Sequence, residues 1–175
     1  MGTLTVQTLQ APTSGANANT ILVPSGQTVK SAGTIIQTVR SEYRTYTTLA
    51  SSSFTATGLT GTITPKFSNS KILITLLING LFKTNNAQYI ALSLYKASSS
   101  IAVLDTSVGY NTAGDEINYG IHSNCYQHED SPSTTSATTY TLYWRSSDAG
   151  TIGINNYNVS NGDSLSTITL QEIAQ

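Results

Sequence analysis

The sequence predicts an all-β protein, an antiparallel β-sandwich or jelly roll that follows a short extended segment. Short runs of Leu, Ile and Val are bounded by clusters of Ser, Thr, Asn and Gly, and Ser and Thr together make up 51 of the 175 residues. No stretch has the 3.6-residue apolar repeat of a long amphipathic helix. Only 10% of the residues are charged, whereas disordered chains combine high charge with few apolar residues. A folded β protein is therefore expected.

The first 33 residues differ from the rest of the chain. Leu4, Val6 and Leu9 are isolated apolar residues in a polar segment, which has too little apolar surface to form a core of its own. We therefore expect residues 1–33 to be an N-terminal anchor that packs on other proteins through these three residues, or a stalk made with partner chains. Residues 34–175 are expected to form the sandwich.

Eleven strands are expected along the chain after residue 33. In order they are 34–43, 46–50, 54–56, 60–65, 71–82, 88–96, 100–106, 118–126, 138–146, 150–157 and 164–172. Each is rich in β-branched or aromatic residues, and the breaks between them carry Gly, Pro or Ser. One such break is Thr57-Gly58, which separates two of the expected short strands.

The segment 138–146 shows the alternation of a half-buried strand. Its apolar face is formed by Tyr140, Leu142 and Trp144, and its other face by Thr139, Thr141, Tyr143 and Arg145. The segment 164–172 alternates less strictly. These patterns predict sheets with one face in a core and one face towards solvent.

The segment 71–82 is apolar on both faces. Ile72, Ile74, Leu76 and Ile78 point one way, and Leu73 and Leu77 point the other way. In a chain this small and polar, another copy of the same chain is the expected cover for the second face. All six residues are therefore predicted to belong to an interface between copies of the chain, with Lys71 and Lys83 as flanking charges that oppose aggregation.

The charge is divided unevenly along the chain. Residues 1–96 contain seven Lys or Arg and one acid, whereas residues 97–175 contain one Arg and eight acids. Strands of the two halves that interleave in one domain would explain this division. Complementary faces that steer subunits together would also explain it.

Several classes of protein are disfavoured. The net charge is −1 and no basic patch is interleaved with aromatic residues, so nucleic acid is not an expected partner. The first residues lack the basic and apolar regions of a signal peptide, and the apolar run at 71–82 is too short to span a membrane as a helix. We expect no membrane insertion.

Catalytic and metal signals are weak. His122, Cys125 and His128 are of types that bind zinc, but on a strand Cys125 points away from the two histidines, so the expectation is no metal and no cofactor, with a metal as the alternative. The acids Asp115 and Glu116 are adjacent and would face opposite ways on a strand. No nucleophile motif occurs, and we expect that the chain is not an enzyme.

Tyrosine is the most frequent aromatic residue, with ten Tyr against three Phe and one Trp. Tyrosine offers flat amphipathic surface that suits sugars and subunit interfaces. Tyr110, Tyr119, Tyr126 and Tyr157 lie in expected loops or strand ends, so they are the candidate ligand-binding residues. The alternative for each is an ordinary strand tyrosine with its hydroxyl at the surface.

Several segments resemble a family of small bacteriophage virion proteins, which includes tail-fibre and structural proteins. The resemblance covers most of residues 20–175, and the segments that carry it are 24–30, 33–39, Phe54-x-x-Thr57-Gly58-Leu59-x-x-x-Ile63-Thr64-Pro65, 68–74 and the closing strand 166–174. It implies a trimeric fibre or spike with a jelly-roll head similar in plan to those of complement C1q and tumour necrosis factor (TNF). The interface expected at residues 72–78 is then a homotrimer interface.

The resemblance also implies a function. The chain is expected to be a virion component whose N-terminal segment contacts other virion proteins and whose head contacts the host surface by binding a glycan or a receptor. The alternative is a capsid decoration or tail-tip scaffold protein that stabilises the particle without binding the host. In either case the expected location is the virion, assembled in the host cytoplasm.

Overall fold

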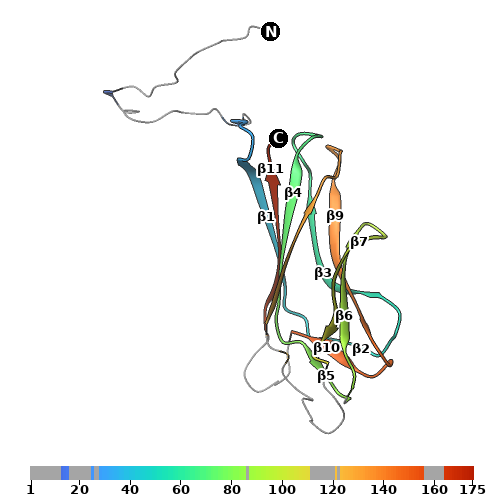
Figure 1. Ribbon diagram of the computed structural model, residues 1–175. Helices are drawn as coiled ribbons and strands as arrows, with labels where there is room; N and C mark the ends of the chain where they lie inside the picture. Colours follow the sequence, from blue (N-terminus) through green and yellow to red (C-terminus); the bar gives the residue numbers. More distant parts are fainter. Residues whose placement is uncertain are drawn as a thin grey trace. The chain divides into compact units, whose positions relative to one another are not determined.

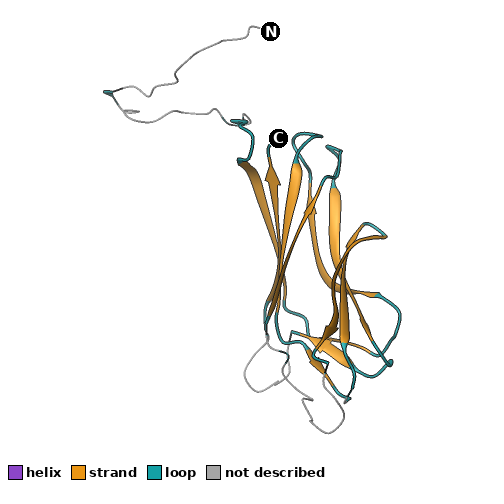
Figure 2. Ribbon diagram, in the orientation of Figure 1, coloured by secondary structure: helices purple, strands orange, loops and turns teal. Residues whose placement is uncertain are grey.

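The structure is a computed structural model of the chain, and all its described elements are strands (Figure 2). It describes residues 13–15, 25, 28–85, 87–110, 121, 123–155 and 164–175. The chain divides into two compact units, Met1–Lys30 and Ser31–Gln175. The predicted anchor residues Leu4, Val6 and Leu9 lie outside the described residues.

Eleven strands form three antiparallel sheets in the described part of Ser31–Gln175 (Figure 1). They are β1 (Ile35–Tyr43), β2 (Thr47–Leu49), β3 (Thr55–Ile63), β4 (Lys71–Ile78), β5 (Phe82–Lys83), β6 (Ile90–Lys96), β7 (Ser99–Val108), β8 (Asn124–Asp130), β9 (Thr138–Ser146), β10 (Ile152–Ile154) and β11 (Ser166–Ile173). The two large sheets have the orders β1-β11-β4-β8 and β3-β9-β6-β7, and the small sheet has the order β2-β10-β5. The all-β prediction is confirmed.

The two large sheets share one apolar core, as expected of a β-sandwich. Along β9 the residues alternate between buried and half-buried positions, with Tyr140, Leu142 and Trp144 at most 1% exposed. Ile168 and Leu170 of β11 and their counterparts on β4 and β6 complete the core from both sheets. The expected strand 138–146 therefore has its predicted bounds and its predicted buried face.

The predicted interface on β4 needs a correction. Ile72, Ile74, Leu76 and Ile78 are fully buried within the chain, because they fill the core between the two sheets. Their side chains have no surface to offer a second copy, so assigning them to a trimer interface was wrong. Leu73 and Leu77 lie on the opposite face of the strand, and Leu77 is 39% exposed.

The expected break at Thr57-Gly58 is a bulge inside one continuous strand. The pairing of β3 with β9 shifts between Ala56 and Thr60, and Gly58 has a φ of +100°. The Thr57 hydroxyl donates to the Leu142 carbonyl oxygen at 3.0 Å, which replaces a ladder hydrogen bond that the bulge removes. A glycine that looks like a turn signal can therefore let a strand kink and continue.

The strand expected at 118–126 is also corrected. β8 spans Asn124–Asp130, so His128 and its neighbours are in a strand and not beyond one. The pairing of Leu77 with Cys125 and of Ile74 with His128 sets its register on β4. Residues 118–120 lie outside the described residues.

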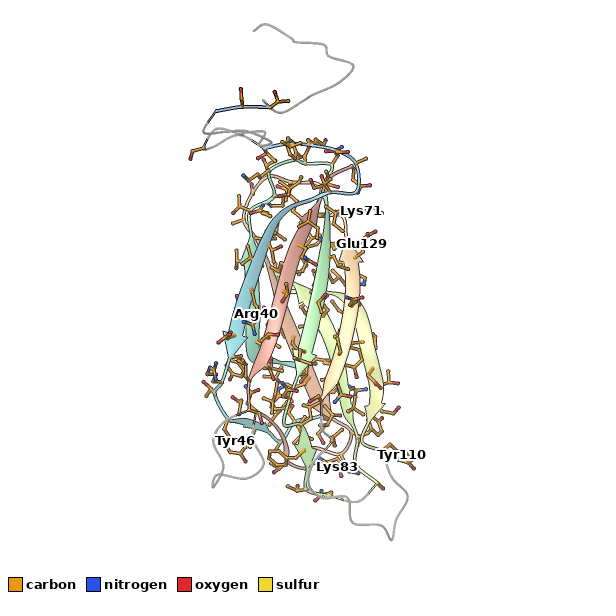
Figure 3. All side chains as sticks on the ribbon, turned by 90° about the vertical axis from the view of Figure 1, so that its left-hand side faces the viewer. Arg40, Tyr46, Lys71, Lys83, Tyr110 and Glu129 are labelled. Carbon is orange, nitrogen blue, oxygen red and sulfur yellow. The ribbon has the colours of Figure 1, made fainter. Side chains whose placement is uncertain are left out.

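Strands of the two oppositely charged halves interleave, as the first of the two explanations predicted. β4, from the basic half, lies between β11 and β8, which come from the acidic half. Two ion pairs join the halves, Lys71 to Glu129 at 2.6 Å and Lys96 to Asp130 at 2.9 Å. Lys71 and Glu129 lie side by side near one end of their sheet (Figure 3). Basic and acidic residues from the two halves of the sequence therefore pair with each other inside one domain.

Both ends of the sandwich unit's chain lie at the same end of the large sheets. The backbone N–H of Gly33 donates to the Ala174 carbonyl oxygen at 2.8 Å, and the N–H of Ala174 donates to the Thr34 carbonyl oxygen at 2.9 Å. The small sheet β2-β10-β5 lies at the other end (Figure 1). This arrangement separates the end where the chain enters from the end that carries the candidate site.

Candidate functional site

Exposed tyrosines gather at the end of the sandwich that carries the small sheet. Tyr46, between β1 and β2, is 49% exposed, and Tyr110, which follows β7, is 56% exposed. Figure 3 shows both at this end, on either side of Lys83. We call the surface formed by Tyr46, Tyr89 and Tyr110 the tyrosine end.

Tyr46 lies on a rigid base. Its ring stacks on that of Phe82, with centroids 5.9 Å apart and planes 14° from parallel. Phe82 is buried against the backbone of Gly153 on the neighbouring strand β10, where a Cβ atom would lie only 1.9 Å from the Phe82 ring. Gly153 therefore makes room for Phe82, and Phe82 holds Tyr46 at the surface.

Tyr110 and Tyr89 form a second aromatic pair. Their rings meet edge to face, with centroids 6.3 Å apart and planes at 64°. Tyr89 is held by Ser147, whose hydroxyl accepts from the Tyr89 N–H and whose N–H donates to the Tyr89 carbonyl oxygen, both at 3.1 Å. Among the described residues, the hydroxyls of Tyr46, Tyr89 and Tyr110 have no hydrogen-bond partner.

A buried polar network supports this end from below. The Lys83 Nζ donates to the Gln88 carbonyl oxygen at 2.9 Å, and the Gln88 side-chain amide donates to the Ser146 hydroxyl at 2.7 Å. Burial lowers the pKa of Lys83, and the nearby carboxylate of Asp148 opposes that change. Lys83 is fully buried, so it supports the surface from below. The expectation that it is a flanking charge that opposes aggregation was therefore wrong.

Asp148 ends the network. Its Oδ1 accepts from the Ser146 hydroxyl at 3.0 Å and from the Gly150 N–H at 2.9 Å, and its Oδ2 accepts from Asn85 at 3.4 Å. Burial raises the pKa of Asp148, but these donors outweigh burial and the net pKa lies below its ordinary value. The carboxylate is thus charged at neutral pH and its oxygens are engaged. The arrangement positions a surface and does not present a poised acid or base.

The structure places the four tyrosines predicted to bind a ligand in different environments. Tyr110 lies at the tyrosine end, whereas Tyr119 and Tyr157 lie outside the described residues. Tyr126 is not in a loop: it lies within β8, packs against the core and donates its hydroxyl to Asp105 at 3.1 Å. Burial first, and the Asp105 carboxylate second, raise the pKa of Tyr126. The predicted placement of Tyr126 in a loop or at a strand end was therefore wrong, because it lies at a half-buried position within a strand.

Sequence reasoning missed Tyr46 and Tyr89. Tyr46 stood at the start of an expected strand, and Tyr89 stood inside another, so neither was counted as a loop residue. A signal was present in the doublet Asn79-Gly80, a turn sequence inside the expected strand 71–82. The structure ends β4 at Ile78, gives Gly80 a φ of +62° and starts β5 of the small sheet at Phe82. The small sheet that brings these residues together is made of two- and three-residue strands, which periodicity does not detect.

The possible metal ligands do not converge in the described part. Cys125 is an exposed free thiol, and His128, three residues further along β8, faces the other way and is half-buried. His122 lies outside the described residues. Among the described residues, no group of three His, Cys, Asp or Glu side chains could hold a metal ion.

The outer face of the β1-β11-β4-β8 sheet is a second candidate surface. Leu73 pairs with Gln171 and Glu129, and Leu77 pairs with Thr167 and Cys125. Leucine and threonine therefore occupy the middle of this face. Arg40 and Glu42 lie on its β1 edge, joined by a hydrogen-bonded ion pair at 2.7 Å. Leu73 and Leu77 are the part of the predicted trimer interface that remains open to another copy.

Neither a scan against protein-family models nor a search of curated proteins finds a match to this chain. Among the described residues, no helix is long and apolar enough to cross a membrane.

Proposed function

We propose that this chain is a bacteriophage virion structural protein, a short trimeric fibre or spike with a jelly-roll head. The N-terminal segment attaches it to other virion proteins, and the tyrosine end of the head contacts a host surface glycan. No catalysis and no cofactor belong to this proposal. One observation carries it: the exposed tyrosines lie at the end of the sandwich opposite the Gly33–Ala174 pairing, which is the end a fibre would present to a host.

The strand order supports a jelly roll. When the eight strands of the two large sheets are numbered along the chain, the sheets read 1-8-3-6 and 2-7-4-5. Each sheet thus takes strands alternately from the two ends of the chain, which is the order that two Greek keys folded together produce. The resemblance to phage virion proteins implies a head of the same jelly-roll plan.

The uncovered leucines support a homotrimer. Leu77 is exposed at the middle of a large sheet face, where a solvated antiparallel sheet would carry polar side chains. A closed cyclic assembly would cover this face and hide it from further association. The threonines beside the leucines would pack closely in such an interface.

The tyrosine end supports contact with a sugar. Aromatic rings offer flat apolar surface to the C–H groups of a saccharide, and free phenolic hydroxyls hydrogen-bond to its hydroxyl groups. Tyr46 and Tyr110 supply both, and each is held by a second aromatic ring. A rigid aromatic surface loses little conformational entropy when it binds.

Two measurements test the proposal. Light scattering of the purified chain at micromolar concentration is expected to give three times the monomer mass of 18.5 kDa, and a monomer mass would contradict the assembly. Phage particles with Tyr46→Ala and Tyr110→Ala are expected to adsorb to host cells more weakly than the parent. Unchanged adsorption would favour the alternative, a decoration or tail-tip protein that stabilises the particle without binding the host.

A further inference from the structure

A second aromatic cluster lies on the outer face of the β3-β9-β6-β7 sheet. It begins beside the tyrosine end, because Arg145 pairs with Ala91, two residues from Tyr89. The rings of Tyr95 and Tyr143 stack with centroids 3.8 Å apart, and the ring of Phe54 is 6.4 Å from that of Tyr95. The Arg145 guanidinium carbon lies 5.2 Å from the centre of the Phe54 ring. We call these four residues the aromatic–arginine patch.

The strand alternation directs the patch outwards. Tyr143 and Arg145 are half-buried positions between the buried Leu142, Trp144 and Ser146 of β9. Tyr95, on the neighbouring strand β6, lies opposite Thr141 of β9. It is therefore on the same face of the sheet as Tyr143 and Arg145. The patch is therefore formed by side chains that the core does not use.

Several hydrogen-bonding groups of the patch have no hydrogen-bond partner among the described residues. In the described part of the chain, the hydroxyls of Tyr95 and Tyr143 have no hydrogen-bond partner, and neither has the Arg145 Nε, which is buried. Besides its contact with the Phe54 ring, the guanidinium makes one long hydrogen bond there, 3.4 Å from Nη1 to the Ser52 carbonyl oxygen. A guanidinium group carries five donors, so most of its capacity is unused.

No carboxylate neutralises Arg145 in the described part of the chain. Each described acid is engaged elsewhere: Glu42 with Arg40 and Arg44, Asp105 with Tyr126, Glu129 with Lys71, Asp130 with Lys96, Asp148 with Ser146 and Gly150, and Glu172 with Lys66. The patch is therefore a positive charge within an aromatic surface. A ligand complementary to this surface would be an anion that also has an apolar face.

Two threonine pairs continue the face beyond the aromatic rings. The hydroxyls of Thr60 and Thr141 are 2.9 Å apart, and those of Thr62 and Thr139 are 2.7 Å apart. Thr60 and Thr62 are exposed, and each pair can exchange its internal hydrogen bond for one to a ligand. The face thus combines ring surface, a cation and a row of hydroxyls.

We propose that the aromatic–arginine patch binds a carboxylated saccharide. The planar guanidinium of Arg145 pairs with the planar carboxylate, Tyr143 and Phe54 contact the sugar C–H face, and the threonine row meets its hydroxyls. The inference names an acidic glycan as the ligand class, and in that sense it rests on the proposed contact with a host glycan. The proposed binding surface runs from Arg145, beside Tyr89, along the sheet to the threonine row, and it does not include Tyr46 or Tyr110.

The test uses the full chain and two tetrasaccharides of the same linkage, one of galacturonic acid and one of galactose. Titration calorimetry is expected to show tighter binding of the acidic tetrasaccharide. Arg145→Gln should weaken that binding about tenfold and leave any binding of the neutral one unchanged. Arg145→Lys should recover part of the lost affinity, because lysine restores the positive charge but not the planar guanidinium group.

The matched control is Arg40→Gln on the outer face of the other large sheet, which should leave binding unchanged. Tyr143→Phe removes only a hydroxyl group and serves as the conservative variant if Arg145→Gln does not fold, with an expected loss of about threefold. Equal binding of the two tetrasaccharides, no binding of the acidic one at millimolar concentration, or unchanged binding by both variants would overturn the inference. Loss of adsorption by the Tyr46 variant with no acidic-sugar binding would leave the proposed function standing and remove this inference alone.

Discussion

Glu172 on β11 accepts hydrogen bonds from the backbone N–H of Lys66, which lies 2.9 Å and 3.0 Å from its two carboxylate oxygens. The N–H of Phe67 and the side-chain amide of Gln37 donate to the same carboxylate, at 3.1 Å and 2.6 Å. Glu172 is fully buried. One side chain therefore ties the loop between β3 and β4 to the last strand of the sheet.

This relationship predicts a pH-dependent loss of stability in Glu172→Gln. Burial raises the pKa of Glu172, but the donors from Lys66, Gln37 and Phe67 outweigh it, so the folded-state pKa lies below the ordinary value of 4.5. The carboxylate therefore stabilises the fold above pH 4.5, and this contribution is lost as the pH falls through the folded-state pKa. Urea denaturation at pH 7 should show the variant less stable by about 1–3 kcal/mol.

The difference between parent and Glu172→Gln should shrink below pH 4.5, because the parent carboxyl becomes neutral as well. Glu42→Gln is the matched control, since Glu42 lies on an exposed face between two arginines. A Glu172→Gln penalty that stays constant from pH 7 to pH 3 would contradict the proposed role of the charge.

Asn155→Asp is expected to destabilise the fold strongly. The Asn155 side-chain amide donates to the carbonyl oxygens of Tyr43 and Thr45, at 2.8 Å and 3.2 Å, and its oxygen accepts from the Ser166 hydroxyl. A carboxylate in this buried place would face two carbonyl oxygens, and we expect a loss of about 3 kcal/mol at pH 7 by urea denaturation. Protonation at low pH should reduce the loss.

Asn124→Asp is the control for this change, because its amide makes one hydrogen bond, 3.2 Å to the Ile121 carbonyl oxygen. Equal losses in the two variants would show that the Asn155 network does not hold the strand ends together.

Gly153→Ala should disturb the tyrosine end. The added Cβ would lie 1.9 Å from the Phe82 ring, so the ring has to move and Tyr46 loses its base. We expect a loss of about 1–3 kcal/mol in thermal or urea unfolding. The double variant Gly153→Ala with Phe82→Leu should recover part of that loss, because leucine leaves room for the methyl group. No recovery would mean that the strain lies in the backbone of β10.

Two tyrosines are expected to resist ionisation. Burial first, and then the Asp130 carboxylate that accepts from its hydroxyl at 2.8 Å, raise the pKa of Tyr140. Burial and Asp105 raise the pKa of Tyr126. Absorbance at 295 nm should show these two hydroxyls ionising only as the protein unfolds at high pH. In Asp105→Asn, Tyr126 should ionise at lower pH, and an unchanged titration would contradict the assignment.

Leu77→Asp should prevent assembly without unfolding the chain. Its side chain is 39% exposed on the outer face of the sheet, so the single chain tolerates a charge there, whereas a covered interface does not. Light scattering should give a monomer, with unchanged circular dichroism. Val103→Asp on β7, where the side chain is 63% exposed, is the control and should keep the parent mass. A trimeric Leu77→Asp would contradict the face proposed for the interface.

The sequence predicted well those features that depend on local pattern. The strand at 138–146 was predicted to the residue, because an unbroken alternation of buried and exposed side chains sets both its bounds and its faces. The interleaving of the two charged halves was one of two explanations, and the ion pair between Lys71 and Glu129 is one of its consequences. In contrast, Thr57-Gly58 was predicted as a break, since glycine signals a turn and a bulge equally well.

The sequence by itself determined that this chain is built of strands, which segments alternate, and that β4 is apolar on both faces. Only the tertiary structure decided which face of β4 fills the core, that Tyr126 bonds to Asp105 within the fold, and that Tyr46, Tyr89 and Tyr110 gather at one end. The physical reason is that alternation is a property of neighbouring residues, whereas burial and assembly at a surface depend on strands distant in the chain. The pairings of β4 with β11 and β8 supply that information, and no local pattern contains it.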